Sequence, residues 1–283
     1  MIVDVHTHLS TLEQWGPIFC EACGRANAAM ELDLHVTPQR HFKAMQHVDR
    51  AVVFGINSLA LQMSTPDDAI AAYVREHPEK IIGFMSIDPH QPDAVDQMER
   101  GVHELGLRGI KMSPVYQNYH PADDKAQRIH AHAQRLGLPI LTHAAFHGIA
   151  NTPMEWANPL LYDPVARQFP DLKIILAHVG LPWFLDAMVM VRKHANVYAD
   201  ISPAFHRHWL YQALACCCEF NVLDKLLFGS DFPFATPQKT MANLRNVNEV
   251  AAGTAGLRIP DEAIEAIIQR DSLALLGLDS HAG

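Results

Sequence analysis

The sequence has 283 residues, of which 49% are hydrophobic and 19% are charged, and its formal net charge is −9. This composition supports a large buried core and excludes extensive disorder, while the negative charge and the absence of any Lys/Arg cluster argue against nucleic acid or anionic membranes as partners. Because no apolar run reaches about 18 residues, no membrane span is expected.

The cysteines and the N-terminus bear on the cellular compartment. Three of the five cysteines, Cys216, Cys217 and Cys218, are consecutive in a segment with a helical pattern, which is not a disulfide framework. The chain opens directly on a strand-like run, Ile2–Val5, without the pattern of a signal peptide. Both features predict a cytoplasmic protein in a reducing compartment.

Short apolar, β-branched runs alternate with helical segments along the chain. Near-continuous apolar runs of this kind are typical of buried parallel strands. The predicted strands are 2–6, 50–56, 81–87, 107–112, 138–143, 173–178, 196–201 and 225–230.

Helix signals lie between these runs. Thr65 and Pro66 are typical of an N-cap followed by proline in the first turn, residues 124–136 carry apolar residues at helical spacing, and Pro260 opens a last helix through Ile268. Eight strands that alternate with helices predict a parallel (β/α)8 barrel, the TIM barrel, as one domain over residues 1–283. An open doubly wound sheet is the alternative, but it would need a glycine-rich loop after the first strand, and Thr7–Thr11 contains no glycine.

The longest irregular stretch is about 10–38, after the first strand. Long loops in compact domains are usually functional, and this one leaves the barrel at the end where active sites lie. We therefore expect residues 10–38 to cover the site.

Polar side chains stand at the carboxyl ends of several predicted strands. His6 and His8 are two apart in a strand and so face the same side, while His143, His178 and Asp231 end or follow three other strands. A single histidine at a strand end is usually a hydrogen-bonded core residue, but four imidazoles and a carboxylate at one barrel end indicate a metal site. Imidazole and carboxylate ligands favour zinc, manganese or iron(II), and an open coordination position is typical of catalysis.

Longer motifs resemble a known family. They are DVHTH at 4–8, GLRGIKMSP at 106–114, LPILTHAAF at 138–146, PDLKIILAHVGLPW at 170–183, NVYADIS at 196–202 and KLLFGSDFPF at 225–234. The chain resembles the amidohydrolase superfamily, and within it the amidohydrolase-related group that includes aminocarboxymuconate-semialdehyde decarboxylase and aromatic acid decarboxylases.

The resemblance implies roles for the same residues. His6, His8, His143 and Asp231 would bind a divalent metal, zinc as first choice and manganese as second. His178 would be either a ligand of a second metal or an acid/base residue beside the first, and Asp231 would also act as the catalytic base.

Lys111 ends the fourth predicted strand, where binuclear amidohydrolases carry a carboxylated lysine that bridges two metals. The resemblance therefore makes Lys111 a candidate for carbamylation, and a lysine at this position favours hydrolysis. Alternatively, Lys111 pairs with Asp200, with Asp231 or with a substrate carboxylate, since a buried lysine has several such uses.

Several loop residues at the same end are candidates for a substrate pocket. They include His147, His206 and Trp183, although solvated loop histidines are equally common. Cys20 and Cys23 form a C-x-x-C pair, but a structural zinc needs four ligands and no second pair lies nearby, so cysteines without a role are favoured.

Two reactions fit these residues. In hydrolysis, metal-activated water attacks the carbonyl of an amide, ester or lactone in a small molecule, with Asp231 and His178 as catalytic residues. The alternative is metal-dependent, non-oxidative decarboxylation of an aromatic or unsaturated acid, and a third possibility is a metal-binding barrel without catalysis. The apolar segment 181–194 is also a candidate homo-oligomer interface, although core packing explains it equally well.

Overall fold

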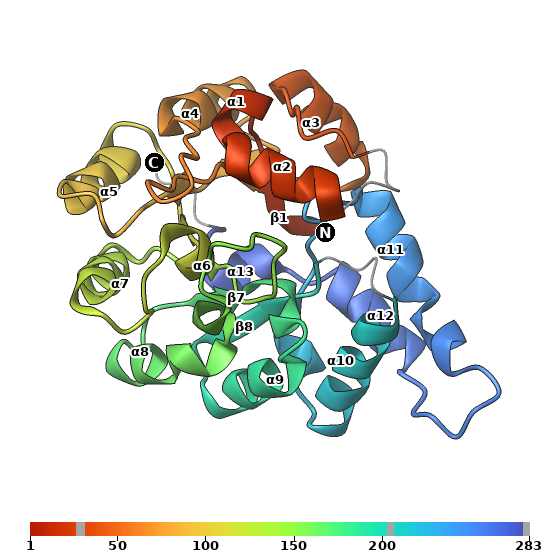
Figure 1. Cartoon of the computed structure of the whole chain (residues 1–283). Coiled ribbons are helices and arrows are strands. Elements are labelled where there is room, and N and C mark those ends of the chain that lie inside the picture. Colours follow the sequence, from red (N-terminus) through yellow and green to blue (C-terminus); the bar gives the residue numbers. More distant parts are fainter. Residues whose placement is uncertain (27–31, 203–206, 280–283) are drawn as a thin grey trace.

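The computed structural model describes residues 1–26, 32–202 and 207–279, and its strands are all parallel. Figure 1 looks along the strands, which lie near the centre with helices around them. The strands are β1 Val3–His8, β2 Arg50–Phe54, β3 Ile81–Gly83, β4 Met85–Ser86, β5 Ile110–Met112, β6 Ile140–Thr142, β7 Ile174–Leu176, β8 Val197–Asp200 and β9 Leu226–Leu227. Only Phe84 separates β3 from β4, so these two correspond to the single strand predicted at 81–87.

The strands close into a ring. One run of paired strands is β1-β2-β3 and the other is β4-β5-β6-β7-β8-β9. Backbone hydrogen bonds join the last strand region to the first, from Val5 N to Phe228 O at 3.0 Å and from Asp231 N to His6 O at 2.8 Å. The eight parallel segments of the described chain therefore form the predicted (β/α)8 barrel.

The helices follow the strands in alternation. Asp123 caps α7 by accepting a hydrogen bond from Ala126 N, and Gly137 ends it in the left-handed region, so its bounds match the prediction. The start of α4 differs, because Pro66 occupies the cap position and the Thr65 hydroxyl bonds that of Ser10 at 2.7 Å. The helices are α1 Leu12–Trp15, α2 Pro17–Ala26, α3 Pro38–Ala44, α4 Asp67–Glu76, α5 Ala94–His103, α6 Pro114–Gln117, α7 Asp124–Leu136, α8 Asp163–Gln168, α9 Phe184–Lys193, α10 Arg207–Glu219, α11 Pro237–Arg245, α12 Asp261–Ile268 and α13 Ser272–Leu276.

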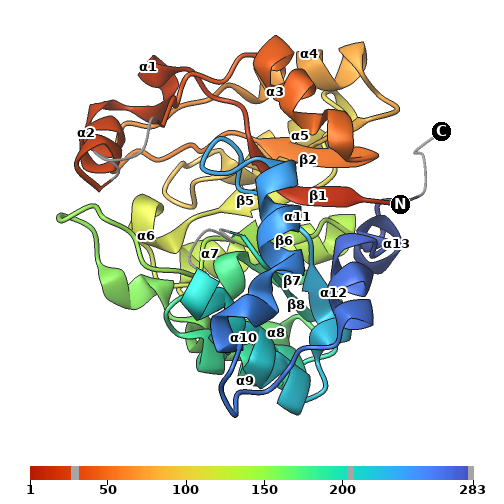
Figure 2. The same cartoon turned by 90° about the vertical axis from the view of Figure 1, so that its right-hand side faces the viewer.

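Apolar packing divides into three clusters that set the place of the site. The largest lies between strands and helices, and a second fills the barrel interior, where Leu273 and Leu276 of α13 cluster with Val3 and Val5 of β1. Figure 2 shows β1 starting near α13 and running toward the end where α1, α2 and α6 lie. Because α13 closes the amino end, the carboxyl ends of the strands face the side on which α1 and α2 lie.

The described parts of the stretch 10–38 contain more regular structure than the sequence predicts. It contains α1 and α2, which are separated by Gly16 at φ 76°, a conformation that favours glycine. The indole Nε1 of Trp15 donates to Leu34 O at 2.9 Å, and Trp15 and Phe19 belong to the third apolar cluster. These two helices cover the carboxyl end of the barrel, as the loop was expected to do.

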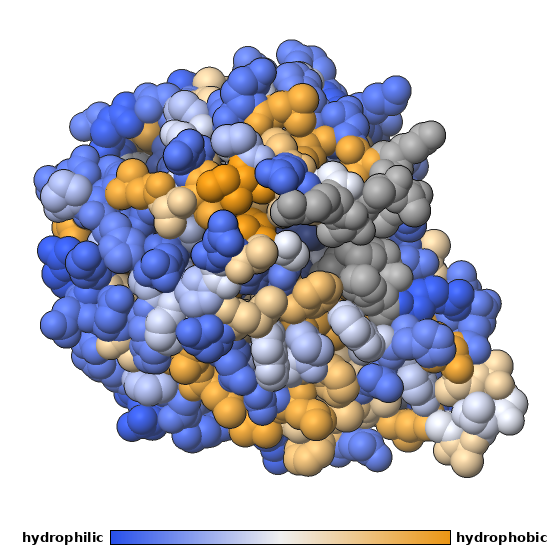
Figure 3. Space-filling view, in the orientation of Figure 1, coloured by the Kyte–Doolittle hydropathy of each residue, from blue (hydrophilic) through white to orange (hydrophobic). Residues whose placement is uncertain are grey.

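The surface carries exposed apolar side chains on α9. Leu185 is 54% exposed and Val189 is 46% exposed, and Figure 3 shows apolar side chains over the lower part of this face, where α8 and α9 lie in Figure 1. The buried side of α9 packs in the core through Ala187 and Val191. Core packing therefore explains only one side of the apolar segment 181–194. Among the described helices, none combines the length and apolarity that a membrane span requires.

Candidate metal centre

The end of β1 places two histidines at the centre of the barrel. His6 and His8 are 0% and 3% exposed. The pairing of β1 with β2 shifts register between Asp4 and Thr7, as at a β-bulge. Such an irregularity allows consecutive residues to face one side, and Val5 in the barrel interior is followed directly by His6 at the cavity.

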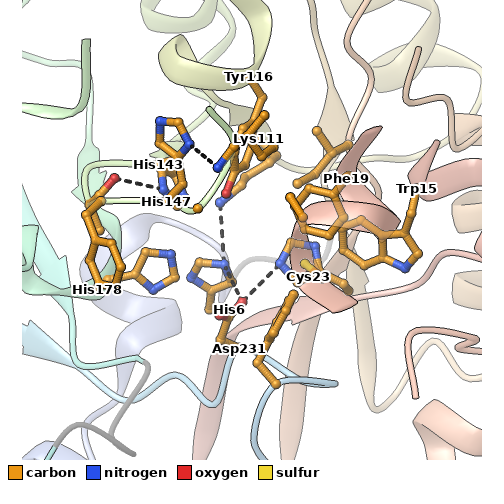
Figure 4. A pocket seen from close by; sticks show the side chains of 18 of the residues that line it. His6, Trp15, Phe19, Cys23, Lys111, Tyr116, His143, His147, His178 and Asp231 are labelled. Atoms are coloured by element: carbon orange, nitrogen blue, oxygen red, sulfur yellow. Dashed lines mark hydrogen bonds and ion pairs between the residues drawn. The ribbon is translucent and has the colours of Figure 1, made fainter. Parts of the chain in front are cut away.

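Asp231 and His178 reach the same point from strained backbone. Asp231 has φ 56° and His178 has φ 60°, in the left-handed region that costs a residue with a side chain about 1–3 kcal/mol. Strain of this kind persists where the surrounding structure fixes a side chain, and it concentrates at functional sites. Figure 4 shows both side chains beside His6 at one cavity.

The hydrogen bonds of His6 leave a lone pair facing the cavity. Its Nδ1 lies 2.9 Å from Oδ2 of Asp200, which only accepts, so Nδ1 carries the proton. Burial holds the pKa of His6 well below its ordinary value, and the ring is therefore neutral. Its Nε2 is an acceptor that lies 3.3 Å from Oδ1 of Asp231, which is also an acceptor when ionised. Two acceptors at this distance need a proton or a metal cation between them.

His8 approaches the same carboxylate oxygen. Its Nε2 lies 3.1 Å from Oδ1 of Asp231, and its buried Nδ1 has no hydrogen-bond partner among the described residues. The candidate ligand atoms of His6, His8 and Asp231 all lie within 4.8 Å of one another. Burial raises the pKa of Asp231 well above its ordinary value when no cation is bound, so a cation here would bring the carboxylate back to its charged form.

His178 belongs to a second hydrogen-bonded group, which lies next to His6, His8 and Asp231. Its Nδ1 donates to Ser202 O at 2.9 Å, and its backbone N donates to Oδ1 of Asp200 at 3.1 Å. Burial lowers the pKa of His178 to about 4, so its Nε2 is left with a lone pair. A second trio of metal-binding groups, His6, His178 and Asp200, also lies within 4.8 Å. Asp200 and Ser202 accept hydrogen bonds from the Nδ1 atoms of His6 and His178, and they thereby orient both rings in this trio.

His143 faces the cavity but lies outside both trios. Its ring centroid is 4.9 Å from that of His178 and 4.9 Å from that of Tyr116. Its Nε2 lies 3.0 Å from Ala145 O, so Nε2 donates and Nδ1 carries the lone pair. The structure thus brings His6, His8 and Asp231 together and holds His143 and His178 beside them.

Lys111 is fully inside the barrel. It is 1% exposed, its Nζ lies 3.4 Å from Nε2 of His6, and it stands 4.9 Å from the centre of the Phe54 ring. Burial lowers the pKa of Lys111 to about 8, although Asp231 and Asp200 oppose that shift. The amine therefore lies next to the predicted ligands and does not form a close ion pair with Asp200.

The cavity above these residues is largely apolar and has a volume of about 370 Å³. The rings of Trp15 and Phe19 stack at 4.8 Å, and Tyr116 meets Phe19 edge-on at 5.8 Å. Its lining consists of His6, His8, Trp15, Phe19, Ala22, Cys23, Ile56, Lys111, Tyr116, His143, Ala145, Phe146, His147, Gly148, Ile149, His178, Leu181, Asp231 and Phe234. A cavity of this size holds a small organic molecule.

The predicted pocket residues have different positions. His147 lines the cavity and its ring meets that of Tyr116 at 5.6 Å. Trp183 is partly buried, packs against the cluster that includes Trp15 and Phe19, and is not among the residues that line the cavity. His206 lies outside the described residues.

Sequence reasoning missed the residues that hold the ligands in place. Asp200 was considered only as a partner of Lys111, whereas it accepts from His6 and from the backbone of His178. Ser202 was not singled out, and Cys23 was expected to have no role but lines the cavity. The position of Asp200 at the end of its strand was the available signal, since it matches that of the predicted ligands.

Comparison with known proteins gives the family. The family model described as Amidohydrolase matches residues 3–278. This chain belongs to the amidohydrolase family. Membership confirms the resemblance seen in the motifs and the prediction that the chain is an enzyme.

One curated relative of this family member is 2-amino-3-carboxymuconate-6-semialdehyde decarboxylase from Dictyostelium discoideum. It is 22% identical over 245 residues, which is 75% of this chain and 66% of the relative. The match thus spans just under two thirds of that relative's length.

Solved structures with the same fold cover nearly the whole family member. An uncharacterised TIM-barrel protein from Bordetella bronchiseptica has a TM-score of 0.74 at 20% identity, covering 98% of each chain. A dihydroxybenzoic acid decarboxylase from Polaromonas sp. JS666, with bound manganese and 2-nitroresorcinol, has a TM-score of 0.68 at 17% identity, covering 99% of this chain and 98% of the other. A probable 2-pyrone-4,6-dicarboxylic acid hydrolase from Acinetobacter baumannii has a TM-score of 0.67 at 14% identity, covering 98% and 99%. At these identities the likeness establishes the barrel fold and not the reaction.

Proposed function

We propose that this protein is a metal-dependent, non-oxidative decarboxylase of a small, flat carboxylic acid. The observation that carries the proposal is the lone pair of His6 Nε2, which faces a carboxylate oxygen of Asp231 at 3.3 Å while Asp200 binds the other ring nitrogen. The curated relative is a decarboxylase, and this favours decarboxylation over the hydrolysis that Lys111 suggested.

The donor set fits a divalent ion. His6, His8 and Asp231 would hold it, with His143 as a further ligand through Nδ1. Imidazole and carboxylate donors suit zinc, manganese or iron(II), and manganese is bound in the Polaromonas enzyme. When bound, the ion supplies a Lewis acid that attracts the substrate carboxylate and a neighbouring oxygen.

The side chains around the ion can then perform the proton chemistry. The ammonium group of Lys111 attracts an anionic substrate. Asp231 or His178 in its protonated form delivers a proton to the carbon that bears the carboxylate. The bond between that carbon and the carboxyl carbon breaks, its electron pair stays on the protonated carbon skeleton, and carbon dioxide leaves, so that an acid anion and a proton give the decarboxylated product.

The cavity wall favours a particular class of substrate. The stacked pair Trp15 and Phe19, together with Tyr116, forms an aromatic wall opposite the ligands. Flat rings and conjugated chains pack well against such surfaces. We therefore propose an aromatic or conjugated unsaturated acid as the substrate.

Hydrolysis remains a second candidate because of Lys111. The pKa of about 8 leaves a fraction of neutral amine at neutral pH, which is the form that adds carbon dioxide to give a carbamate and a proton. A carbamate at Lys111 would add a ligand for a second metal and favour attack on an ester, lactone or amide.

Product analysis separates these functions. Protein loaded with manganese or zinc is incubated with a panel of hydroxybenzoic and unsaturated acids, and separately with lactones, esters and amides. The proposal predicts release of carbon dioxide and loss of its mass from an acid, abolished in Asp231→Ala. Hydrolysis of a lactone, ester or amide without conversion of any acid would contradict it.

A further inference from the structure

A buried chain of hydrogen bonds lies on the outer side of β1, behind its two histidines. The hydroxyl Oγ1 of Thr7 lies 2.5 Å from Val52 O and 2.8 Å from Nε2 of His41. The other ring nitrogen, Nδ1 of His41, lies 2.9 Å from the hydroxyl of Tyr73. Thr7, His41 and Tyr73 are each 1% exposed or less.

The backbone carbonyl of Val52, at one end of this series, fixes the direction of the other hydrogen bonds. Val52 O can only accept, so the Thr7 hydroxyl donates its single proton there and must accept from His41 Nε2–H. Burial lowers the pKa of His41 to about 3, so its ring is neutral and Nδ1 accepts from the Tyr73 hydroxyl. Every donor and acceptor in the chain is satisfied in one arrangement, which fixes the tautomer of His41.

These hydrogen bonds join β1 to β2 and α3 at the point where the pairing of β1 with β2 is irregular. Thr7 stands between the two predicted ligands, His6 and His8, and the register of β1 against β2 shifts between Asp4 and Thr7. The shift interrupts the ladder between β1 and β2 at His6, whose backbone O accepts from Asp231 N on the other side. The Thr7 hydroxyl supplies a side-chain link to β2 there.

His41 also contacts the segment that follows β9, on the other side of β1. Its ring lies 5.9 Å from that of Phe232, which follows Asp231, and Phe232 O accepts from His8 N at 2.8 Å. One buried imidazole from α3 therefore contacts the side chains of Thr7 and Phe232, which are next in sequence to His8 and Asp231.

We propose that His41 is a positioning residue that sets the affinity for the divalent metal by holding β1 through Thr7. This inference rests on the proposed metal site. His41 does not touch the ligand atoms, and its effect passes through the Thr7 hydroxyl and the Phe232 ring. The bonds behind a metal's ligands usually govern metal affinity by about 10- to 100-fold.

The test compares the affinity of the full-length protein for Mn²⁺ across matched variants, by competition with a chelator. Thr7→Val and His41→Met remove the bonds with little change of volume and should weaken Mn²⁺ binding about 10- to 100-fold. Thr7→Ser and His41→Gln keep a hydroxyl and an amide donor at the same places and should bind close to wild type. The melting temperature of each metal-free variant is measured in parallel.

Thr65→Val is the control for a general loss of stability. Among the described residues, the buried Thr65 hydroxyl forms a hydrogen bond only with the hydroxyl of Ser10. It should lower the melting temperature and leave Mn²⁺ affinity unchanged. Wild-type affinity in Thr7→Val and His41→Met would overturn the proposal, and so would equal losses in the conservative and non-conservative variants. If the wild type itself binds no Mn²⁺, the proposed metal site is wrong, and this result is distinct from a failure of the role proposed for His41.

Discussion

Asp200 decides which nitrogen of His6 faces the cavity. Its Oδ2 accepts from Nδ1 of His6, while its Oδ1 accepts from the backbone N of His178 and of Ser202. A carboxylate that binds the far side of a ligand imidazole fixes its tautomer and raises its basicity. One side chain thus orients His6 and His178 together.

Replacement of Asp200 by Asn tests this role. The amide keeps one acceptor but loses the charge, and its NH2 group must face either the two backbone donors or the Nδ1–H of His6. We expect the dissociation constant for Mn²⁺ to rise about 10- to 100-fold, measured by chelator competition. Ser202→Ala, which removes a hydroxyl 3.3 Å from His6 Nδ1, should have a smaller effect. Unchanged metal binding in Asp200→Asn would show that His6 needs no such partner.

Replacement of Lys111 distinguishes between two roles for this residue, binding the substrate anion and bridging two metal ions. If it binds the substrate anion, Lys111→Met keeps the metal and lowers kcat/KM about 10- to 100-fold, the loss expected for a hydrogen bond to a charged group worth about 1.5–3 kcal/mol. Metal content by elemental analysis and steady-state kinetics measure the two effects. Two metal ions per chain in the wild type, both lost in Lys111→Met, would instead support the carbamate and hydrolysis.

His130 makes folding stability depend on pH away from the site. It is fully buried in α7, neither ring nitrogen has a partner among the described residues, and burial lowers its pKa from 6.5 to about 3. Between these values the unfolded chain binds the extra proton, so stability falls as pH is lowered from 6.5 toward 3. One such group contributes about 2 kcal/mol between pH 6.5 and pH 5.

Urea unfolding at several pH values measures this contribution. The His130→Leu variant should lose about 2 kcal/mol less than wild type between pH 6.5 and pH 5. Parallel stability curves for the two proteins would show that His130 does not titrate on unfolding.

At the scale of elements, α1 and α2 form the outer wall of the cavity. Phe19 of α2 stacks on Trp15 of α1 and meets Tyr116 of α6, so the wall depends on contacts between short helices. Phe19→Leu should remove the stacked surface without touching the ligands. We expect KM to rise about tenfold and kcat to stay the same, as for a contact made equally in the ground and transition states. The same change at half-exposed Phe220 is the control, and a fall in kcat alone would contradict a binding role.

The strands were predictable from sequence because buried parallel strands leave continuous apolar runs, as in 173–178 around β7. The helices α1 and α2 were not, because α1 has only four residues and Gly16 separates it from α2, which begins at Pro17. The H-x-H pair and Asp231 could be read from strand-end positions. The bond from His143 Nε2 to Ala145 O could not, since a ring orientation depends on contacts that form only in the fold. The same holds for the link from Thr7 to His41, which are 34 positions apart.

At the scale of the whole molecule, the apolar interior and the candidate metal site lie at opposite ends of the barrel. One apolar cluster and α13 fill the amino end of the ring, while acids and imidazoles that are costly to bury gather at the other end. Asp4, Asp200 and Asp231 lie together there with Lys111 as the neighbouring cation, and like charges among buried carboxylates raise the pKa of Asp231 beyond the effect of burial. A bound divalent cation would offset the negative charge of these carboxylates, and we therefore claim that the site binds one.

Metal content per chain tests that claim most directly. Protein purified without chelator, or reconstituted with Mn²⁺ or Zn²⁺ and then desalted, is measured by elemental analysis beside His6→Ala and Asp231→Ala. We predict one divalent ion per wild-type chain and loss of that ion in both variants. A wild-type chain that holds no divalent metal after reconstitution would contradict the account.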